Sequence, residues 1–313
     1  MTTTTDNTPA PAGTWRALVD ALPLTGMLLG IALAWLSWPD VANSDGEVPP
    51  LQPVDTETAD ALERVFSAYG YGWPADQVPP VSVQGFPADL GEQPTGAKKS
   101  LFFRTLLPLV LAENARIADQ RETLMQAIDG RLPAARRSEV LTALAAEYGV
   151  ETEPLTDATA RTLRARVDTV PPALALAQAA KESGWGTSRF ALEGNNLFGE
   201  WTWDASQGMT PRNRAADADH FVRRFDNLRA SVRSYLNNLN RHAAYDHFRA
   251  LRGEARRAGR AMTPMEMAGG LDQYSERGWD YVKEVRAMIT TNRLAQVMAN
   301  ARLTRLPERV AQR

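Results

Sequence analysis

Apolar side chains recur every three or four positions through most of the chain after residue 97, as they do along one face of an α-helix. This spacing predicts a helix that starts near Lys98 and another from Ser138 to Tyr148. Gly149 follows the second helix, and glycine readily adopts the left-handed conformation that ends helices. These features predict a helical subregion over residues 97–168. The apolar face of its first helix is formed by Phe102, Leu106, Leu109, Val110, Ile117, Leu124 and Ile128.

A second helical block is expected over residues 169–300. It opens with Thr169-Val-Pro-Pro172, and proline is tolerated in the first turn of a helix. In residues 200–225, by contrast, aromatic and polar side chains alternate as in β-strands. The pattern predicts a mainly α fold with a small β lobe. Further helices are predicted over 227–240 and 244–257, with a capping box at 263–266. Residues 279–298 predict a final long helix or a broken pair of helices.

The first 96 residues follow other patterns. Residues 1–20 are rich in Thr, Pro and Asp and predict a disordered tail. Residues 21–39 carry no charge and are just long enough to predict a transmembrane helix. Residues 40–96 are rich in Pro and Gly and predict a linker with one short helix over 56–68.

Two other interpretations of residues 21–39 are less favoured. A core helix would show a single apolar stripe, whereas apolar residues here run all around the helix. A cleaved signal peptide would end in small residues spaced as Ala-x-Ala, which the sequence after Asp40 matches poorly. Only Arg16 is basic before the segment, and Asp20 opposes it, so the orientation signal is weak. We expect an uncleaved anchor with the N-terminus inside the cytoplasm.

Composition and charge narrow the possible functions. The formal net charge of −2 gives no positive surface for nucleic acid, so we expect no nucleic-acid partner. There is no cysteine, which excludes disulfides, thiolate metal sites and a cysteine nucleophile. His242 and His247 lie five residues apart and form no metal-binding motif, so we expect neither a metal nor a cofactor. No pattern in the chain predicts the oligomeric state.

The segment from Ala175 to Ala191 carries the chemistry. It places Glu182 on the last turn of an apolar helix, beside Trp185 and two glycines. Burial beside an indole and the negative end of the helix dipole both disfavour the charged form, which raises the pKa of Glu182. A carboxyl that is still protonated near neutral pH can act as the proton donor in glycoside cleavage. An isolated glutamate at this place would more often pair locally with Lys181 or Arg189.

Several blocks around Glu182 together resemble the N-acetylglucosaminidase family of lysozyme-like folds, which includes FlgJ-like and bacterial Bax-type proteins. The resemblance extends over about residues 97–292 and is most specific in the pairing of Glu-Ser-Gly-Trp-Gly with Asn-Leu-Phe-Gly. The blocks are Phe102-Phe-Arg-Thr-Leu-Leu-Pro108, Leu176-Ala-Gln-Ala-Ala-Lys-Glu-Ser-Gly-Trp-Gly186, Gly194-Asn-Asn-Leu-Phe-Gly199, Tyr274-Ser-Glu-Arg-Gly278 and Tyr281-Val-Lys-Glu-Val285.

The resemblance implies roles for particular residues. Glu182 would be the proton donor, and either Tyr281 or Tyr274 would be the active-site tyrosine. Related proteins hold a second carboxylate in the β lobe, and at a distance of roughly 6.5–9.5 Å from the donor such a group can activate water. If none lies there, the N-acetyl group of the substrate could serve as nucleophile. The candidates for the second carboxylate are Asp217, Asp219 and Glu200, and those for substrate binding are Trp185, Asn196, Phe198, Glu200 and Trp201.

The activity implied by the resemblance is that of a peptidoglycan hydrolase. It would be an endo-β-N-acetylglucosaminidase that cleaves the β-1,4 bond after N-acetylglucosamine, with residues 169–300 as the catalytic domain. The alternatives are a muramidase that acts like a lytic transglycosylase and a catalytically inactive, membrane-tethered glycan-binding module. With the predicted anchor, we expect a single-pass protein of the bacterial inner membrane. Its catalytic domain would be in the periplasm, and its partners would be the cytoplasmic membrane and the glycan strands.

Overall fold

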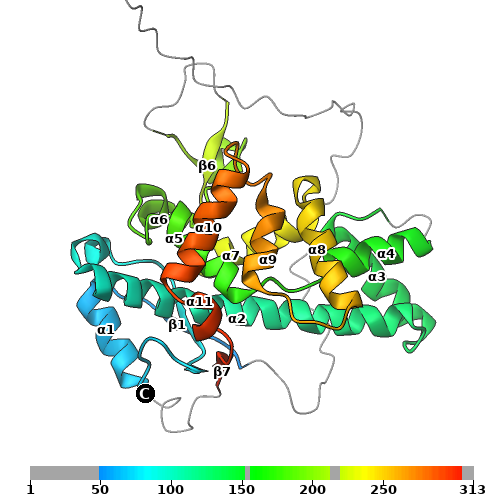
Figure 1. Cartoon of the computed structure of the whole chain (residues 1–313), viewed down its shortest axis with the longest axis horizontal. Coiled ribbons are helices and arrows are strands. Elements are labelled where there is room, and N and C mark those ends of the chain that lie inside the picture. The colour runs from blue at the N-terminus through cyan, green and yellow to red at the C-terminus, as the bar shows by residue number, and fades with distance from the viewer. Residues whose placement is uncertain (1–48, 152–155, 212–218, 305–313) are drawn as a thin grey trace, which may run out of the picture. The chain divides into compact units, whose positions relative to one another are not determined.

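The computed structural model describes residues 49–151, 156–211 and 219–304. Over these residues the chain is mainly helical with a few short strands, which confirms the mainly α prediction (Figure 1). The predicted tail over residues 1–20 and the predicted anchor over residues 21–39 lie outside the described residues. Within the described ranges, no helix has both the length and the hydropathy needed to cross a membrane.

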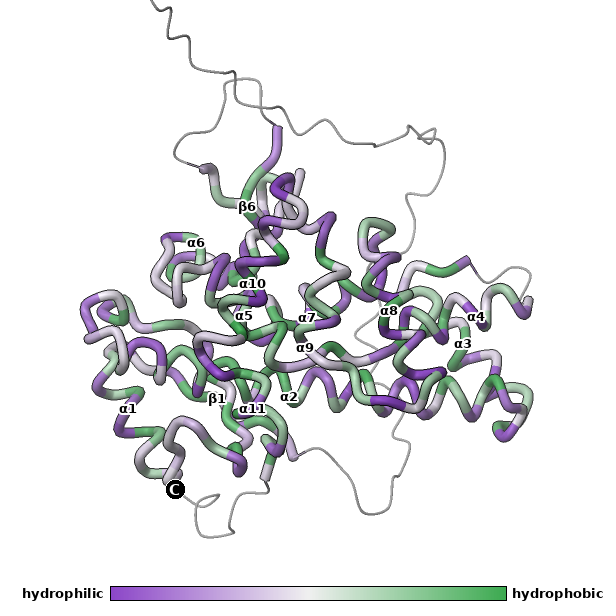
Figure 2. The backbone as a smooth tube through the Cα atoms, in the orientation of Figure 1, coloured by the Kyte–Doolittle hydropathy of each residue, from purple (hydrophilic) through white to green (hydrophobic). Residues whose placement is uncertain are grey.

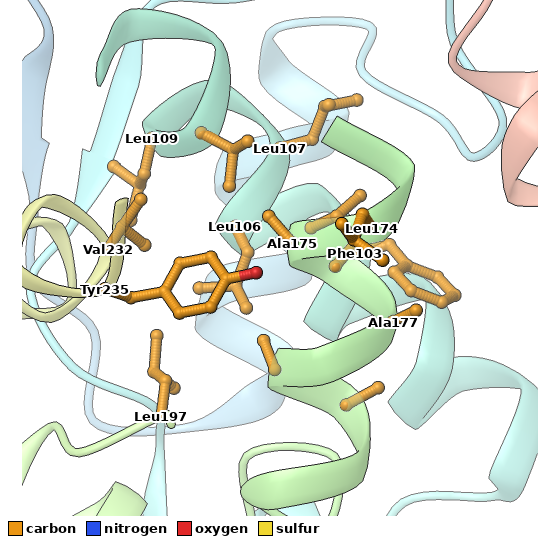
Figure 3. Close-up of a cluster of buried hydrophobic side chains, with 14 of the residues drawn as sticks. Phe103, Leu106, Leu107, Leu109, Leu174, Ala175, Ala177, Leu197, Val232 and Tyr235 are labelled. Carbon is orange, nitrogen blue, oxygen red and sulfur yellow. The ribbon is translucent and has the colours of Figure 1, made fainter. Parts of the chain in front are cut away.

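The longest helix, α2 (Thr95–Ile128), forms the centre of the core. Ten consecutive residues from Leu101 to Val110 are buried, so this stretch is enclosed by protein on all sides. It packs against α3 (Ala134–Tyr148), α5 (Pro172–Glu182) and α7 (Leu228–Arg241). Figure 3 shows leucines of α2 meeting side chains of α5 and α7, and Figure 2 shows hydrophobic segments gathered where these helices meet.

The prediction of a linker over residues 40–96 is wrong from residue 49 onward. The strands β1 (Gln52–Val54) and β3 (Val81–Val83) pair in parallel, and β2 (Gln77–Val78) pairs in parallel with β7 (Arg302–Leu303). The short helix is present as α1 (Ala59–Ala68), followed later by the 3₁₀ turn η1 (Ala88–Glu92). Phe66 and Phe86 from this segment are buried in the main core. The prolines and glycines therefore join short, packed elements, and their abundance does not mark a flexible linker.

The remaining helices agree well with the periodicity of the sequence. Gly149 ends α3 in the left-handed conformation, with φ 63° and ψ 48°, and Pro172 occupies the first turn of α5. The predicted C-terminal helix is broken in two at Arg293, which has a φ of 51°. The other helices and turns are α4 (Asp157–Arg166), α6 (Arg189–Gly194), η2 (Ala205–Gln207), η3 (Ala243–Tyr245), α8 (Asp246–Arg257), α9 (Pro264–Met267), η4 (Ala268–Leu271), α10 (Trp279–Thr291) and α11 (Leu294–Val297).

The predicted β lobe is a small antiparallel sheet with the strand order β4-β6-β5. Its strands are β4 (Trp201–Thr202), β5 (Gly208–Met209) and β6 (Phe221–Arg223). In this register Val222 pairs with both Trp201 and Met209, one on each side. The sheet directly follows the Asn-Leu-Phe-Gly block, which places it close to the end of α5 in sequence.

A buried carboxylate on α2 ties this helix to α7. The side chain of Glu113 is fully buried and pairs with Arg116 at 3.0 Å, Arg229 at 2.6 Å and Arg233 at 2.8 Å. These ion pairs lower the pKa of Glu113 to about 2, although its burial acts in the opposite direction. The carboxylate is therefore ionised over the whole physiological range, and the arginines compensate for its burial.

Replacing this carboxylate tests its contribution to stability. We expect Glu113→Gln to lower the free energy of unfolding by about 3 kcal/mol at pH 7, because the arginines lose their buried anion. The depressed pKa means that the stabilisation is present above about pH 4.5 and is lost as the pH falls toward 2. Urea unfolding at several pH values should thus show a difference between variant and wild type that shrinks in acid.

The matched control is Glu139→Gln on α3. Glu139 pairs with Arg136 at 2.9 Å, but its side chain is 57% exposed. We expect a loss of less than about 0.5 kcal/mol, since surface ion pairs contribute little. Equal losses for the two variants would contradict a special role for Glu113.

Candidate active site

Glu182 is the last residue of α5, and a tight turn follows it. Gly184, Trp185 and Gly186 all have positive φ, at 57°, 63° and 78°. Glycine adopts this conformation easily, whereas a tryptophan does so only when its surroundings hold it there. Ser183 supplies part of this support, because its Oγ donates to the carbonyl of Ala179 at 2.6 Å and accepts from the amide of Gly186 at 2.8 Å. The turn therefore ends the helix abruptly at the carboxyl group.

Phe86, two residues before η1, explains why the turn needs glycine at its last position. A Cβ on Gly186 would lie 2.7 Å from the ring of Phe86. Phe86 itself stacks on Phe102 of α2, with ring centroids 5.5 Å apart. The folded N-terminal segment and α2 together thus support the turn that presents Glu182.

The carboxyl group of Glu182 lies in a partly buried environment that favours its protonated form. Burial raises the pKa of Glu182, and the nearby Glu284 carboxylate acts in the same direction. A hydrogen bond with Tyr281 and the charge of Lys181 oppose this rise without cancelling it. The Oε1 atom is buried and has no hydrogen-bond partner among the described residues. A charged carboxylate with a buried, unpaired oxygen is costly, which agrees with a raised pKa.

A chain of hydrogen bonds through the core holds Glu182 in place. The hydroxyl of Tyr235 on α7 donates to Gln178 Oε1 at 2.6 Å, and Gln178 Nε2 donates to the hydroxyl of Tyr281 at 2.9 Å. The Tyr281 hydroxyl is then left to donate its own proton to Glu182. Figure 3 shows the Tyr235 ring reaching from α7 across the core toward α5. Each polar group thus has a definite donor or acceptor role, which leaves the Tyr281 hydroxyl a single orientation toward the carboxyl.

The structure distinguishes the two candidate tyrosines. Tyr281 contacts Glu182 directly, whereas Tyr274 stacks on the Tyr281 ring at 5.2 Å and donates to the carbonyl of Phe198 at 3.0 Å. Tyr274 therefore supports Tyr281 and joins the segment before α10 to the Asn-Leu-Phe-Gly block.

Trp185, which was expected to bind substrate, packs against α2. Trp185 packs edge-on against Phe102 and Phe103, and the ammonium of Lys99 lies 4.5 Å from the centre of its ring. The indole of Trp185 therefore contacts α2. The aromatic side chain that interacts with Glu182 is instead that of Tyr281.

Asn196 and Phe198 are buried and have no surface to offer a ligand. The side chain of Asn196 donates to the carbonyls of Glu200 and Arg223, both at 2.8 Å, and so fastens the β lobe. Phe198 stacks on Tyr235 with the ring centroids 3.9 Å apart. Core hydrogen bonds and stacking therefore occupy both side chains in this structure, and direct contact with substrate stays a prediction for each.

Glu200 carries the second carboxyl group with a raised pKa. Burial raises the pKa of Glu200 to about 7, while a 2.6 Å hydrogen bond from Ser234 and the charge of Arg223 act against this rise. Its Oε1 atom is buried and unpaired within the described part of the chain. Burial raises the pKa of Tyr245 to about 12, and the charges of Glu200 and Glu182 act in the same direction. The two carboxyl groups therefore act on the same tyrosine hydroxyl.

The other predicted acids and aromatic residues differ in position. Asp219 is exposed, and Asp217 lies outside the described residues. Trp201 is 40% exposed and stacks on His220 with ring centroids 3.7 Å apart. Trp201 therefore presents an aromatic surface on the β lobe, as expected of a residue that contacts sugar.

A polar groove of about 870 Å³ lies between α7, α6 and the β lobe. Ser234 and Arg223, the partners of Glu200, line it, whereas Glu182 does not. The groove gives solvent a route to the hydrogen-bond partners of Glu200. Within the described ranges, no group of three or more His, Asp or Glu side chains is arranged to hold a metal ion.

Sequence reasoning missed Gln178, Tyr235 and Tyr245. Gln178 precedes Glu182 by one helical turn and is the only amide in an otherwise apolar stretch of α5, which is a usable signal. Tyr235 lies among the buried apolar residues of α7, where nothing in the sequence distinguishes a core tyrosine from a functional one. Only the packing of both α5 and α7 against α2 brings its hydroxyl to Gln178.

Comparison with known proteins agrees with this geometry. A family profile described as mannosyl-glycoprotein endo-beta-N-acetylglucosaminidase matches residues 158–294, a range that includes Glu182, Glu200 and Tyr281. The chain is 34% identical over 210 residues to Protein bax of Escherichia coli, covering 65% of this chain and 73% of that protein. No solved structure matches the chain significantly. The chain therefore belongs to the glucosaminidase family, as a bacterial protein of the Bax type.

Proposed function

We propose that the protein is a peptidoglycan hydrolase, an endo-β-N-acetylglucosaminidase that cleaves the β-1,4 bond after N-acetylglucosamine. The observation that supports this proposal best is the partly buried carboxyl of Glu182, with a raised pKa and one unpaired buried oxygen. In the proposed reaction, Glu182 transfers its proton to the glycosidic oxygen as the bond to the anomeric carbon breaks. Family membership supports the reaction class, a glycoside hydrolase acting at N-acetylglucosamine.

Tyr281 is proposed to orient this proton donor. Because its hydroxyl accepts from Gln178, it presents its own proton to Glu182 and holds the carboxyl in one rotamer. Once Glu182 has given up its proton, the same hydrogen bond stabilises the carboxylate, since hydrogen bonding to the charged form favours that form. Tyr281 thus interacts with Glu182 both before and after the proton transfer.

Glu200 is proposed as the second carboxyl group, which would position or activate the attacking water. Of the two candidates that the structure describes, Asp219 is exposed, whereas Glu200 has a buried carboxyl oxygen and a raised pKa. Its charge, like that of Glu182, also raises the pKa of Tyr245. A pKa of about 7 leaves a large ionised fraction at neutral pH, as a general base requires.

The location of the protein is part of the proposal. With the uncharged residues 21–39 as an anchor, the enzyme would work from the periplasmic face of the inner membrane, next to its glycan substrate. The family name refers to a mannosyl-glycoprotein, so a glycoprotein glycan is the competing substrate.

The proposed proton donor is tested by Glu182→Gln. We expect the nearly isosteric amide to leave the fold intact and to lower kcat by roughly 10²–10⁴-fold, because it cannot donate a proton. Digestion of purified sacculi, followed by mass spectrometry of the new ends, should show reducing N-acetylglucosamine for the wild type. Anhydro sugar ends would reveal a lytic transglycosylase instead. Cleavage of a high-mannose glycoprotein with intact sacculi would move the substrate to glycoproteins, and full activity of the variant would refute the mechanism.

Tyr281→Phe tests the orienting hydroxyl. Its hydrogen bond lowers the pKa of Glu182, so its loss should raise that pKa and move the alkaline limb of the pH–rate profile to higher pH. The loosened carboxyl should also lower kcat by roughly 10- to 100-fold. Tyr274→Phe is the matched control, because its hydroxyl bonds a backbone carbonyl, and its alkaline limb should stay in place. A limb that moves equally in both variants would argue against a specific role for Tyr281.

Single replacements of the three candidate acids identify the second carboxyl group. We expect Glu200→Gln to lower kcat by roughly 10²-fold, as loss of a general base does. Asp219→Asn, at an exposed position, should leave kcat within about twofold of wild type. Steady-state rates on sacculi give the comparison, with Asp217→Asn as the third arm. A large effect at Asp217 or Asp219 combined with none at Glu200 would reassign the role.

A further inference from the structure

A lysine directly precedes the proposed proton donor. Lys181 lies on the last turn of α5, and its positive charge favours the ionised form of Glu182, which is the inactive form of a general acid. An ammonium beside a carboxyl normally lowers the pKa of that carboxyl by one unit or more. Burial raises the pKa of Glu182 in spite of this charge, and any group that offsets the charge of Lys181 favours the protonated form further.

Glu284 on α10 provides the opposite charge. Its Oε2 atom lies 2.5 Å from the ammonium of Lys181, which is held 5.5 Å from the centre of the Tyr281 ring. Lys181 and Glu284 both act on Glu182 with opposite signs. The carboxylate of Glu284 therefore offsets part of the effect of the Lys181 charge on Glu182.

Arg277 holds Glu284 in this position. One guanidinium nitrogen bonds Glu284 Oε2 at 3.0 Å and the other contacts Oε1, which orients the carboxylate from the segment before α10. These two cations lower the pKa of Glu284 to about 2, so it is ionised throughout the range in which the enzyme works.

The other ionisable groups near Glu182 do not replace Glu284. Those that interact with Glu182 besides this ion pair are tyrosines with raised pKa values, which are neutral at physiological pH. On α2, Lys99 bonds Asn292 and lies over Trp185, and on α9, Glu266 pairs with Arg260. The tyrosines are Tyr235 of α7, Tyr245 of η3, Tyr274 of the segment before α10, and Tyr281 of α10 itself.

We propose that Glu284 is a positioning residue that binds the Lys181 ammonium and so favours the protonated form of Glu182. This inference rests on the proposed role of Glu182 as proton donor. It assigns a function to a surface ion pair whose contribution to stability is small, because the side chain of Glu284 is 38% exposed. The ion pair thus tunes the pH range of the enzyme.

The test is the pH–rate profile of sacculus digestion by the full chain. In Glu284→Gln the charge of Lys181 is no longer balanced, so Glu182 ionises more easily and the alkaline limb should move down by about one pH unit. On the acid side of this limb, the rate should stay close to that of the wild type. Lys181→Met should move the limb upward, and the double variant Lys181→Met/Glu284→Gln should return it close to the wild-type position.

Asp280→Asn is the matched control. It removes one negative charge from the same helix, but Asp280 is 68% exposed and pairs with Lys283 at 2.9 Å. We expect its alkaline limb to stay within about 0.2 pH units of the wild type, because exposed charges are strongly screened. If Glu284→Gln lowers the rate by the same factor at every pH, or shifts the limb no more than Asp280→Asn does, the proposal is overturned.

A second measurement separates this inference from the proposed function. Titration of the ¹³C-labelled carboxyl groups by NMR follows Glu182 without activity, and its signal is assigned by its absence in Glu182→Gln. A lower midpoint in Glu284→Gln supports the positioning role even if Glu182→Gln proves active, which would defeat only the proposed function. An unchanged midpoint overturns the positioning role even if Glu182→Gln is inactive.

Discussion

The site depends on keeping one carboxyl group partly buried without a direct counter-ion. Glu182 ends α5, and its surroundings provide a tyrosine hydroxyl, apolar surface and an ion pair whose two charges act on it with opposite signs. A carboxyl removed from water and left unpaired favours its neutral form, so this environment keeps a proton available. Most other features near the site help to keep the Glu182 carboxyl in this environment. The turn after α5 places the group, and Gln178 fixes the hydroxyl that faces it.

The architecture supplies the rigidity that such a site needs. Both Gln178 and Glu182 lie on α5, which packs against the buried stretch of α2, so movement of the carboxyl would have to disturb the core. The ion pairs of Glu113 join α2 to α7, and α7 in turn carries Tyr235. The position of the Glu182 carboxyl therefore depends on core packing, and on ion pairs and hydrogen bonds that lie away from it.

The carboxyl groups of Glu182 and Glu200 have different surroundings, which agrees with the different roles proposed for them. Glu182 interacts with the Tyr281 hydroxyl and with the charges of Lys181 and Glu284. Glu200 accepts a hydrogen bond from Ser234, and its partners Ser234 and Arg223 line the polar groove. Burial raises the pKa of both groups, so it is their hydrogen-bond and charge partners that distinguish them. Tyr245 is the group on which both act, and it links the helical part of the site to the β lobe.

The sequence by itself determined the mainly helical fold, the end of α3 at Gly149 and the start of α5 at Pro172, and it indicated Glu182 as the candidate proton donor. These features depend on periodicity, caps and a contiguous motif, all of which are local. Only the tertiary structure decided that residues 49–96 are folded, that Trp185 and Phe198 pack in the core, and that Tyr281 contacts the acid. It also brought Tyr235 to Gln178 and Glu284 to Lys181, pairs separated by 57 and 103 positions. Such contacts depend on how helices pack, and the pattern within a single helix cannot report which distant side chain will lie against it.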